Sequence, residues 1–460
     1  MKMDVIRSTR YDYFMIWKKR LLQSLLIVNL FIILAIWFPY SGRLIMDWYM
    51  ESYSFGLVFK SIANLAGLLA AFLVLLQILL VSRAKWLEGF FGLDKLSRWH
   101  HIFGFLIPVF IIVHPVLLVV GASMIGKTRP WAQFMGYVNY YEGVPAAAVS
   151  FLLFLLLIGL SVLIVYKKLK YETWYFTHVF MYAAVLLAMG HQFSVGSDLQ
   201  AGWPRYYWMG LYIFTFANLV IYRFWRPAYQ SIKHAFRVQK VVVENQDCVS
   251  IYIAGRGLNG FKVKPGQFFI MRFLDKHRWW QAHPFSLSCA PNGQYLRITV
   301  KNLGDYTSRM RELRPGTRVV VDGPHGVFTP DQAITSKYLL IAGGIGLTPL
   351  MSMAQELAKE NQDVIFLRGA RTQQDLILTH ELNEIFKQSP NSRHDVLSHD
   401  EAWLGERGVI DLEKIERLAP DLRQRDIYVC GPSIMMKNIL HALKQAGVPK
   451  RQIHFEKFSL

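Results

Sequence analysis

Residues 100–118 read HHIFGFLIPVFIIVHPVLL, an apolar run that carries His100, His101 and His114. A second apolar run, FTHVFMYAAVLLAMGHQF over residues 176–193, carries His178 and His191. Each run is long enough for a membrane-spanning helix. At about 1.5 Å of rise per residue, His100 and His114 would lie roughly 20 Å apart along one helix. An ionisable side chain inside a membrane is costly, so this recurrence indicates a functional role.

The composition predicts a membrane half and a globular half. A chain of 460 residues suggests two or three domains, and its apolar fraction of 53% is concentrated in residues 1–228. The formal charge of +19 does not indicate a nucleic-acid partner, because many basic residues flank the apolar runs. We predict a six-helix transmembrane bundle in contact with membrane lipid, with spans at 21–38, 56–81, 101–121, 146–166, 175–195 and 206–222.

Basic residues gather in alternate connections of these six spans. They are Lys18, Lys19, Arg20, Arg83, Lys85, Lys95, Arg98, Lys167, Lys168, Lys170, Arg223 and Arg226. The positive-inside rule therefore places both termini in the cytoplasm of a multi-pass protein of the cell membrane. We expect the first span to be retained, because no small-residue cleavage site follows it. The three cysteines fall in the cytosolic half and predict reduced thiols, not a disulfide framework or metal site.

This topology brings the four histidines to two levels. Spans three and five run in the same direction, so His100 and His178 share the inner level, while His114 and His191 share the outer level. Pairs of imidazoles are a natural axial set for haem iron, and the four residues predict two b-type haems (haem b). Taken singly, a histidine near a helix end is more often an interfacial or satisfied polar group.

Two details of the histidine pattern stay open. His101 competes with His100 as the inner ligand, although only His100 falls on the helical face of His114. On an ideal helix, the side chains of His178 and His191 would point in directions that differ by about 140°. A distortion near Gly190, or ligation from different sides of the helix, would be needed.

The chain changes character after Pro227. Strand patterns at 238–243, 249–253 and 267–271 begin a series that continues to about residue 329 and predicts a small antiparallel β-barrel. From Tyr338 the pattern becomes strand, glycine turn and helix, which predicts an α/β nucleotide-binding domain. The predicted domains are therefore 1–228, 233–332 and 333–460.

Four motifs in the cytosolic half carry a family resemblance. They are His283-Pro284-Phe285-Ser286-Leu287-Ser288, Val300-Lys301-Asn302-Leu303-Gly304-Asp305-Tyr306-Thr307, Gly343-Gly344-Ile345-Gly346-Leu347-Thr348-Pro349 and Tyr428-Val429-Cys430-Gly431-Pro432. In order and spacing they resemble the ferric reductase / NADPH oxidase superfamily, in which a ferric reductase-like transmembrane domain is fused to a ferredoxin-reductase-like FAD/NAD(P)-binding module. The four histidines, with Gly104 after His100, resemble the same superfamily's haem pattern.

The resemblance implies roles for these residues. The first two motifs form the FAD site: Ser286 supplies the hydroxyl near the flavin N5 edge, while His283, Lys301 and Thr307 face the pyrophosphate. The third motif is the nicotinamide-nucleotide loop, where phosphate approaches backbone N–H groups. Cys430 lies beside the nicotinamide in the fourth motif, although a small buried hydrophobe is the alternative reading.

Cofactor preference and flavin shielding are less determined. Arg371 after strand 363–368 could pair with a 2′-phosphate and favour NADPH over NADH, or be a solvated arginine. The family often ends in an aromatic residue over the flavin, whereas this chain ends in Leu460. We therefore expect either that Phe458 serves as the shield or that the flavin is shielded more loosely.

These features predict a transmembrane flavocytochrome b. Electrons would pass from cytosolic NAD(P)H through FAD and two haems to an extracytoplasmic acceptor, with ferric chelates favoured. The alternative is an NADPH oxidase that reduces oxygen to superoxide. Some oxidases of the family have a further histidine where this chain has Leu118, which argues weakly against that alternative.

Two other readings differ in class. An electron-feeding subunit would dock a partner protein at the outer loop 125–143, whose aromatic residues are otherwise an interfacial belt. A haem-free protein using its histidines for proton passage would leave the flavin and nucleotide motifs without a purpose.

Overall fold

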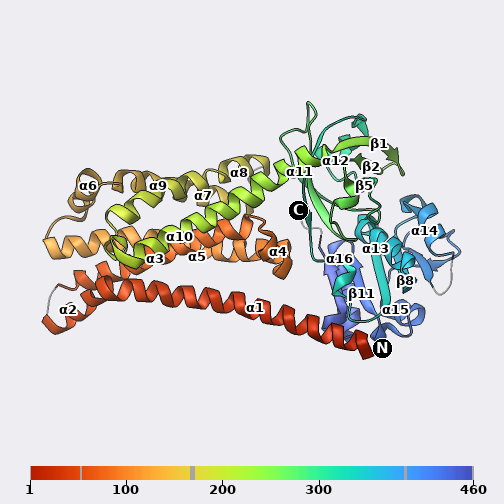
Figure 1. The fold of residues 1–460 in the computed structure, drawn as a ribbon, viewed down its shortest axis with the longest axis horizontal. Coiled ribbons are helices and arrows are strands. Elements are labelled where there is room, and N and C mark those ends of the chain that lie inside the picture. The colour runs from red at the N-terminus through yellow and green to blue at the C-terminus, as the bar shows by residue number, and fades with distance from the viewer. Residues whose placement is uncertain (1, 52–53, 166–170, 388–390, 458–460) are drawn as a thin grey trace. The chain divides into compact units, whose positions relative to one another are not determined.

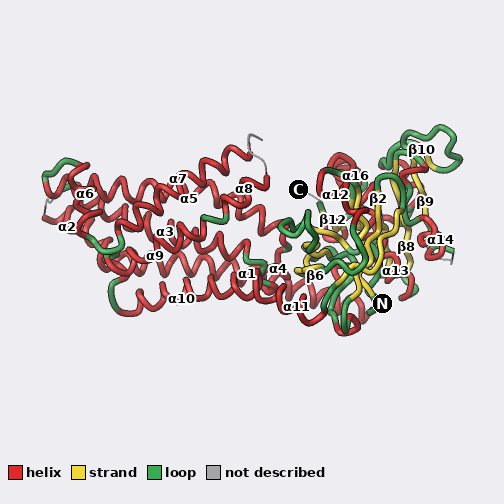
Figure 2. The backbone as a smooth tube through the Cα atoms, turned by 90° about the horizontal axis from the view of Figure 1, so that it is seen from above, coloured by secondary structure: helices red, strands yellow, loops and turns green. Residues whose placement is uncertain are grey.

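The computed structural model describes residues 2–51, 54–165, 171–387 and 391–457. The chain divides into two compact units. The helical unit comprises Phe14–Ala84 and Lys95–Ile221, and the strand unit comprises Met1–Tyr13, Lys85–Asp94 and Tyr222–Leu460. In Figure 2 the strands, drawn in yellow, belong to the strand unit.

Long helices build the helical unit, and Figure 1 labels them. Their bounds are α1 (Lys2–Trp37), α2 (Arg43–Glu51), α3 (Gly56–Val81), α5 (Leu93–Gly126), α6 (Pro130–Tyr140), α7 (Val144–Val165), α8 (Tyr171–His178), α9 (Met181–Ser194) and α10 (Gly202–Leu219). A π-helical turn at Phe38–Gly42 joins α1 to α2. The basic residues Lys167, Lys168 and Lys170 lie outside the described residues.

Within the described residues, five helical segments are long and apolar enough to cross a membrane. They are Arg20–Met50, Gly56–Val81, Leu93–Gly126, Val144–Ile164 and Glu172–Ser194. The sixth predicted span, 206–222, folds largely as α10 but is not among these five. Arg205, Asn218 and several tyrosines make α10 less apolar than the others. The sequence therefore predicted apolar helices correctly, and the six-span count stays a prediction.

Large apolar side chains cover much of the outside of the helical unit. Phe31 is 66% exposed, Leu152 is 65% exposed and Ile213 is 66% exposed. The interior packs around residues such as Phe72, Trp208 and others from α3, α7, α9 and α10. An apolar exterior around a packed interior is the arrangement that a lipid bilayer stabilises.

The fifth predicted span is interrupted between its two histidines. Helix α8 ends at His178 and α9 begins at Met181. Phe180 N–H donates to the Thr177 carbonyl and Tyr182 N–H donates to the Val179 carbonyl, which tightens the chain over one turn. This interruption resets the helical phase, so the distortion expected near Gly190 lies instead at residues 179–180.

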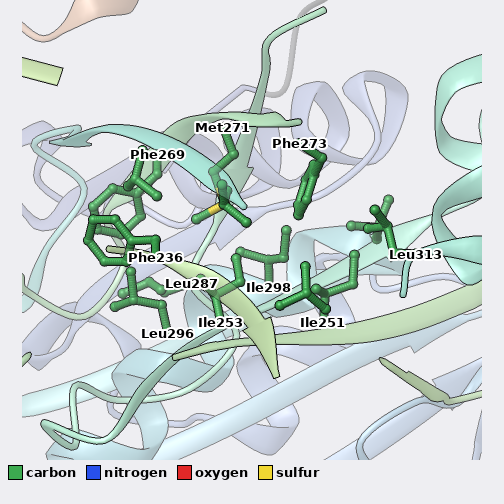
Figure 3. Packing of buried hydrophobic residues seen from close by; sticks show 14 of the residues in the cluster. Phe236, Ile251, Ile253, Phe269, Met271, Phe273, Leu287, Leu296, Ile298 and Leu313 are labelled. Atoms are coloured by element: carbon green, nitrogen blue, oxygen red, sulfur yellow. The ribbon is translucent and has the colours of Figure 1, made fainter. Parts of the chain in front are cut away.

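Two three-stranded antiparallel sheets form the first part of the strand unit. One has the order β1 (Arg237–Val243), β2 (Cys248–Ala254), β5 (Tyr295–Lys301), and the other has the order β4 (His283–Ser286), β3 (Phe268–Phe273), β6 (Val319–His325). Their inward side chains share one apolar core, drawn in Figure 3. Isolated bridges Arg237↔Arg318 and Leu287↔Ile298 connect the two sheets. The structure therefore shows two packed antiparallel sheets in this region, and the closed β-barrel stays a prediction.

A six-stranded parallel sheet forms the second part of the strand unit. Its order is β10 (Glu406–Arg407), β9 (Ser392–Leu397), β8 (Asp363–Ala370), β7 (Lys337–Gly343), β11 (Asp426–Cys430), β12 (Ile453–Glu456). Helices α13 (Leu347–Lys359) and α14 (Thr379–Ile385) pack on one face, and α15 (Leu412–Leu418) and α16 (Ser433–Gln445) pack on the other. From β7 the chain adds β8, β9 and β10 on one side and then returns to add β11 and β12 on the other. Ligands of such folds bind at this switch point, between β7 and β11.

Three shorter helices complete the strand unit: α4 (Lys85–Phe91), α11 (Arg226–His234) and α12 (Asp305–Ser308). Helix α4 connects α3 to α5 along the chain, yet it belongs to the strand unit.

Candidate functional site

The inner histidines lie close together, with their rings nearly perpendicular. The ring centroids of His100 on α5 and His178 at the end of α8 are 6.3 Å apart, with 76° between the ring planes. The Nδ1 atom of His178 lies 3.2 Å from the Ser161 hydroxyl, which orients the ring. The neighbouring His101 is exposed, and its ring contacts Phe105. The geometry therefore favours His100 over His101 as the partner of His178.

The outer histidines repeat this spacing. The ring centroids of His114 on α5 and His191 on α9 are also 6.3 Å apart, at 37°. The Nδ1 of His114 lies 2.8 Å from the Ala63 carbonyl, which can only accept, so Nδ1 carries the proton and Nε2 keeps its lone pair. A Cβ atom at Gly67 would lie 2.7 Å from His114 Nδ1, so only glycine leaves room for this ring.

The spacing of both pairs suits a shared metal ion. An imidazole nitrogen binds a transition metal at about 2.0 Å, so two rings on opposite sides of one ion have centres roughly 6 Å apart. The buried Nδ1 atoms of His100 and His191 have no hydrogen-bond partner among the described residues. Across those same residues, no group of three or more His, Cys, Asp or Glu side chains could hold a metal ion. The two histidines of each pair could therefore serve as two ligands of one metal ion such as haem iron.

The two predicted flavin segments meet in the strand unit. The rings of His283 on β4 and Tyr306 on α12 lie 3.9 Å apart between centroids. The Ser286 hydroxyl and the Tyr306 hydroxyl are both buried, and neither has a hydrogen-bond partner within the described parts of the chain. Unpaired buried hydroxyls are costly, which fits the binding of a polar group such as a flavin.

The other predicted flavin residues have different surroundings. Phe285 packs against the core of the two sheets, while Pro284 is exposed. The Thr307 hydroxyl accepts hydrogen bonds from the N–H groups of Leu303 and Gly304, at 2.8 Å and 3.1 Å. Thr307 thus shapes the loop, and its contact with the pyrophosphate stays a prediction. Lys301 ends β5 beside this loop.

The two nucleotide loops leave the carboxyl edge of adjacent strands. Cys430 at the end of β11 pairs with Ala342 on β7, so the loops Gly343–Gly346 and Cys430–Pro432 begin side by side. A Cβ atom at Gly346 would lie 2.3 Å from the Cys430 carbonyl oxygen. Glycine therefore permits the close approach of the two loops, at the position where α/β sheets bind nucleotides.

The remaining predicted nucleotide residues follow these loops. The Thr348 hydroxyl donates to the Ile345 carbonyl at 3.0 Å, and Pro349 lies in the first turn of α13. Arg371 follows β8, is 66% exposed, and has a nitrogen 3.5 Å from Asp375. Phe458 and Leu460 lie outside the described residues.

Glu456 is a candidate site residue that the sequence analysis missed. It ends β12 directly opposite Cys430, and its buried Oε2 atom has no hydrogen-bond partner among described residues. Burial, aided by the nearby charges of Asp94 and Glu88, raises the pKa of Glu456 to about 8. Burial also raises the pKa of the Cys430 thiol. The sequence feature that could have indicated this residue is an acidic side chain at the end of the short strand Ile453–Glu456.

Comparison with known families identifies three regions of the chain. Residues 66–189 match the ferric reductase like transmembrane component, residues 233–329 match an FAD-binding domain, and residues 340–441 match the oxidoreductase NAD-binding domain. The first region contains His100, His114 and His178 and ends two residues before His191, the second contains the two flavin segments, and the third contains both nucleotide loops.

Curated relatives cover about half of the chain. The glycine betaine monooxygenase reductase subunit of Chromohalobacter salexigens is 32% identical over 238 residues, which is 49% of this chain and 64% of that protein. An NADPH oxidoreductase of Mycobacterium tuberculosis is 28% identical over 232 residues, covering 49% of this chain and 60% of that protein. The chain thus spans less than two thirds of these relatives.

A solved structure is similar over the same share. The FAD/NAD binding domain of nitric oxide dioxygenase from Vibrio cholerae O1 biovar El Tor is 24% identical, with a TM-score of 0.44. The match covers 48% of this chain and 97% of that domain.

The three matched regions define a membrane component joined to an FAD- and NAD-binding oxidoreductase module. This order of modules is that of the ferric reductase / NADPH oxidase type of fusion, as the four motifs predicted.

Proposed function

We propose that this chain is a transmembrane flavocytochrome b that moves electrons from cytosolic NAD(P)H to an acceptor on the other side of the membrane. The observation that carries the proposal is the pair of 6.3 Å histidine spacings at two levels of one helical unit. The attached FAD- and NAD-binding regions supply the electron donor side.

The strand unit would hold the donor side. FAD held there would supply both two-electron and one-electron chemistry, as transfer from a nicotinamide to a one-electron carrier needs. Ser286 would donate its unpaired hydroxyl to the flavin edge, and His283 with Tyr306 would border the flavin. The glycine loop at 343–346 would present backbone N–H groups to the nucleotide phosphates. Cys430 and Glu456 would lie beside the nicotinamide, because they end adjacent strands.

The helical unit would hold two haems. Haem iron supplies a one-electron carrier whose potential depends on its axial ligands. His100 and His178 would bind the inner haem, and His114 and His191 the outer haem. Ala63 and Ser161 would fix the orientations of His114 and His178, because a hydrogen bond to the second ring nitrogen commonly orients a metal-bound histidine.

For the acceptor, we propose a ferric chelate at the outer haem. Two histidine ligands leave no open position on the iron, so the acceptor would be reduced without binding the metal. Such outer-sphere transfer is open to a ferric chelate as well as to oxygen, and Leu118, where some oxidases of the family have a further histidine, favours the chelate. Oxygen reduction to superoxide is the alternative outcome of the same experiment.

The test uses purified full-length protein reconstituted with haem and FAD. Anaerobic absorbance is followed after addition of NADPH or NADH, and then after admission of a ferric chelate or oxygen. We expect the Soret band of a bis-histidine haem, its shift on reduction, and reoxidation faster with the chelate than with oxygen. Absence of haem absorbance would overturn the proposal, and turnover with oxygen alone would replace the acceptor.

A further inference from the structure

Glu88 on α4 makes an unusual set of contacts for a residue in a short inter-span connection. Its side chain is only 4% exposed. The Gly326 N–H donates to Oε1 at 2.8 Å, Lys85 Nζ donates to Oε2 at 2.7 Å, and His325 Nδ1 lies 3.0 Å from Oε2. Three partners on one buried carboxylate exceed what an exposed helical ion pair provides.

His325 completes the contact from the other side. It is fully buried at the end of β6, and its Nε2 lies 3.2 Å from Asp322 Oδ1. Lys85 also donates to the Pro324 carbonyl. Burial disfavours the Glu88 carboxylate, but His325 and Lys85 outweigh burial and hold the pKa of Glu88 at about 2. The charged carboxylate is therefore built into the contact. We call Glu88, Lys85, His325 and Asp322 the α4 clamp.

The clamp lies in the same row of the sheet as the candidate flavin site. Phe268 on β3 pairs with Ser286 on β4 on one side and with His325 on β6 on the other. Directly paired residues of antiparallel strands project from the same face of a sheet. The rings of Phe268 and His325 are 5.7 Å apart, as this register requires. One residue therefore separates the unpaired Ser286 hydroxyl from the clamp.

The clamp is also close along the chain to the inner histidine pair. Glu88 precedes His100 by twelve residues, and the segment between them runs from α4 directly into α5. A contact that fixes α4 on the flavin sheet therefore fixes the start of the helix that carries His100. Electron tunnelling falls steeply with distance, so small displacements of this segment would change its rate.

We propose that Glu88 and His325 are positioning residues for electron transfer from the flavin to the inner haem. This inference rests on the proposed function. Overall, one NAD(P)H reduces two ferric haems to ferrous haems and releases one proton. The clamp changes none of these groups chemically; it fixes α4, and with it the first residues of α5, on the sheet that carries the candidate flavin site.

The variant Glu88→Gln keeps the size of the side chain but removes the charge that His325 and Lys85 stabilise. Its matched control is Glu356→Gln, because Glu356 and Lys359 also form an i,i+3 pair on a helix of the strand unit, but an exposed one. Wild type and both variants are compared as full-length protein, after equal FAD and haem contents are verified.

The first measurement is hydrogen exchange without any donor or acceptor. The Gly326 amide donates directly to Glu88, so we expect it to exchange about tenfold faster in Glu88→Gln and unchanged in Glu356→Gln. Unchanged exchange at Gly326 in Glu88→Gln would show that the clamp does not hold α4, and would overturn the proposal.

The second measurement separates the two redox steps by anaerobic stopped-flow absorbance. In Glu88→Gln we expect flavin bleaching by NADPH within about twofold of wild type, and haem reduction slowed by about tenfold or more. A merely structural role would slow both steps together or neither, and either result would overturn the proposal. Wild-type protein without haem absorbance would instead refute the proposed function itself.

A second variant keeps the test decisive if Glu88→Gln folds poorly. His325→Gln removes the imidazole partner of Glu88 on β6. Together with the double variant, the two single variants form a double-mutant cycle. Because both residues act through one contact, the double variant should slow haem reduction no more than the slower single variant. Slowing that multiplies across the two sites would show independent roles and contradict the clamp.

Discussion

Both units contain buried polar groups without partners in the part of the chain that the structure describes, at the candidate flavin site in the strand unit and at the paired histidines in the helical unit. In the strand unit, Arg368 donates to both oxygens of Asp395 at 2.7 Å and 2.8 Å, with both side chains nearly inaccessible, whereas the Ser286 and Tyr306 hydroxyls have no partner among described residues. In the helical unit, buried nitrogens of His100 and His191 and the Gln77 carbonyl oxygen have no partner among described residues. Buried polar groups are normally hydrogen-bonded. The comparison teaches that paired groups maintain the fold, whereas unpaired ones indicate where a bound group belongs.

The largest effect on cofactor binding and activity should come from replacing a histidine that is proposed to bind haem. We expect His178→Ala to abolish the inner haem's absorbance and all electron transfer to the acceptor, because one axial ligand is lost. Absorbance of the purified protein, with haem content by extraction, measures this. His101→Ala is the matched control and should retain both haems. If His178→Ala keeps the wild-type haem spectrum, His178 is not a ligand of an inner haem.

The next largest effect should come from Gly67→Ala. The added Cβ would meet the His114 ring and displace it from the Ala63 carbonyl, so one of two haems should be lost or altered. Gly159→Ala is the control, since nothing lies near a Cβ at that helical position. Haem-to-protein ratio and reduction spectra distinguish the outcomes. If Gly67→Ala keeps two unaltered haems, the orientation of the His114 ring beside Gly67 is not needed for haem binding.

In the strand unit, we consider the removal of one member of a buried ion pair. Asp395→Leu leaves the buried Arg368 without its carboxylate, which should lower the free energy of unfolding by about 3–5 kcal/mol. Thermal unfolding of the full-length protein, followed by circular dichroism, measures the loss. Glu406→Leu removes the partner of the half-exposed Arg417 and should lower the free energy of unfolding much less, because solvent screens an exposed pair. Equal losses in both variants would contradict the assignment of stability to buried pairs.

Ser286→Ala separates site from fold within the strand unit. The hydroxyl has no partner among described residues, so its removal should not lower the unfolding temperature. Flavin reduction by NADPH should nevertheless slow by about tenfold, because the flavin edge loses a donor. Rapid-mixing absorbance under anaerobic conditions gives the rate. Destabilisation without a kinetic effect would make Ser286 a structural residue.

The smallest expected effect is a change in pH dependence from Glu456→Gln. Folding raises the pKa of Glu456 from its ordinary 4.5 to about 8. Between these values the unfolded chain releases the proton that the folded chain retains, so stability falls as pH rises, by at most about 1.4 kcal/mol per pH unit. Glu456→Gln should remove this slope. Unfolding temperatures across the window test it, and an unchanged slope would assign the titration to another group.

Local patterns carried much of the prediction. The apolar helices, the strand at Tyr338–Ala342 and the order of the motifs could all be predicted from sequence, because hydrophobic periodicity and glycine turns are short-range signals.

Distances between segments remote in the chain could not be predicted in this way. The helical break at residues 179–180 was expected near Gly190, since sequence gives a phase mismatch but no position for its relief. Glu456 went unnoticed because its importance depends on the pairing of β12 with β11. Glu88 looked like one acid in a basic connection, and only its contact with His325 makes it distinctive.

The amino-acid sequence by itself determined which residue types are available and in which local elements they lie: four histidines on apolar helices and four motifs on strands and turns. The tertiary structure alone decided which of these side chains meet, how far apart the rings lie, and which polar atoms are left unpaired. The physical reason is that local conformation follows from short-range sterics and periodic burial, whereas contacts and desolvation depend on the packing of the whole chain.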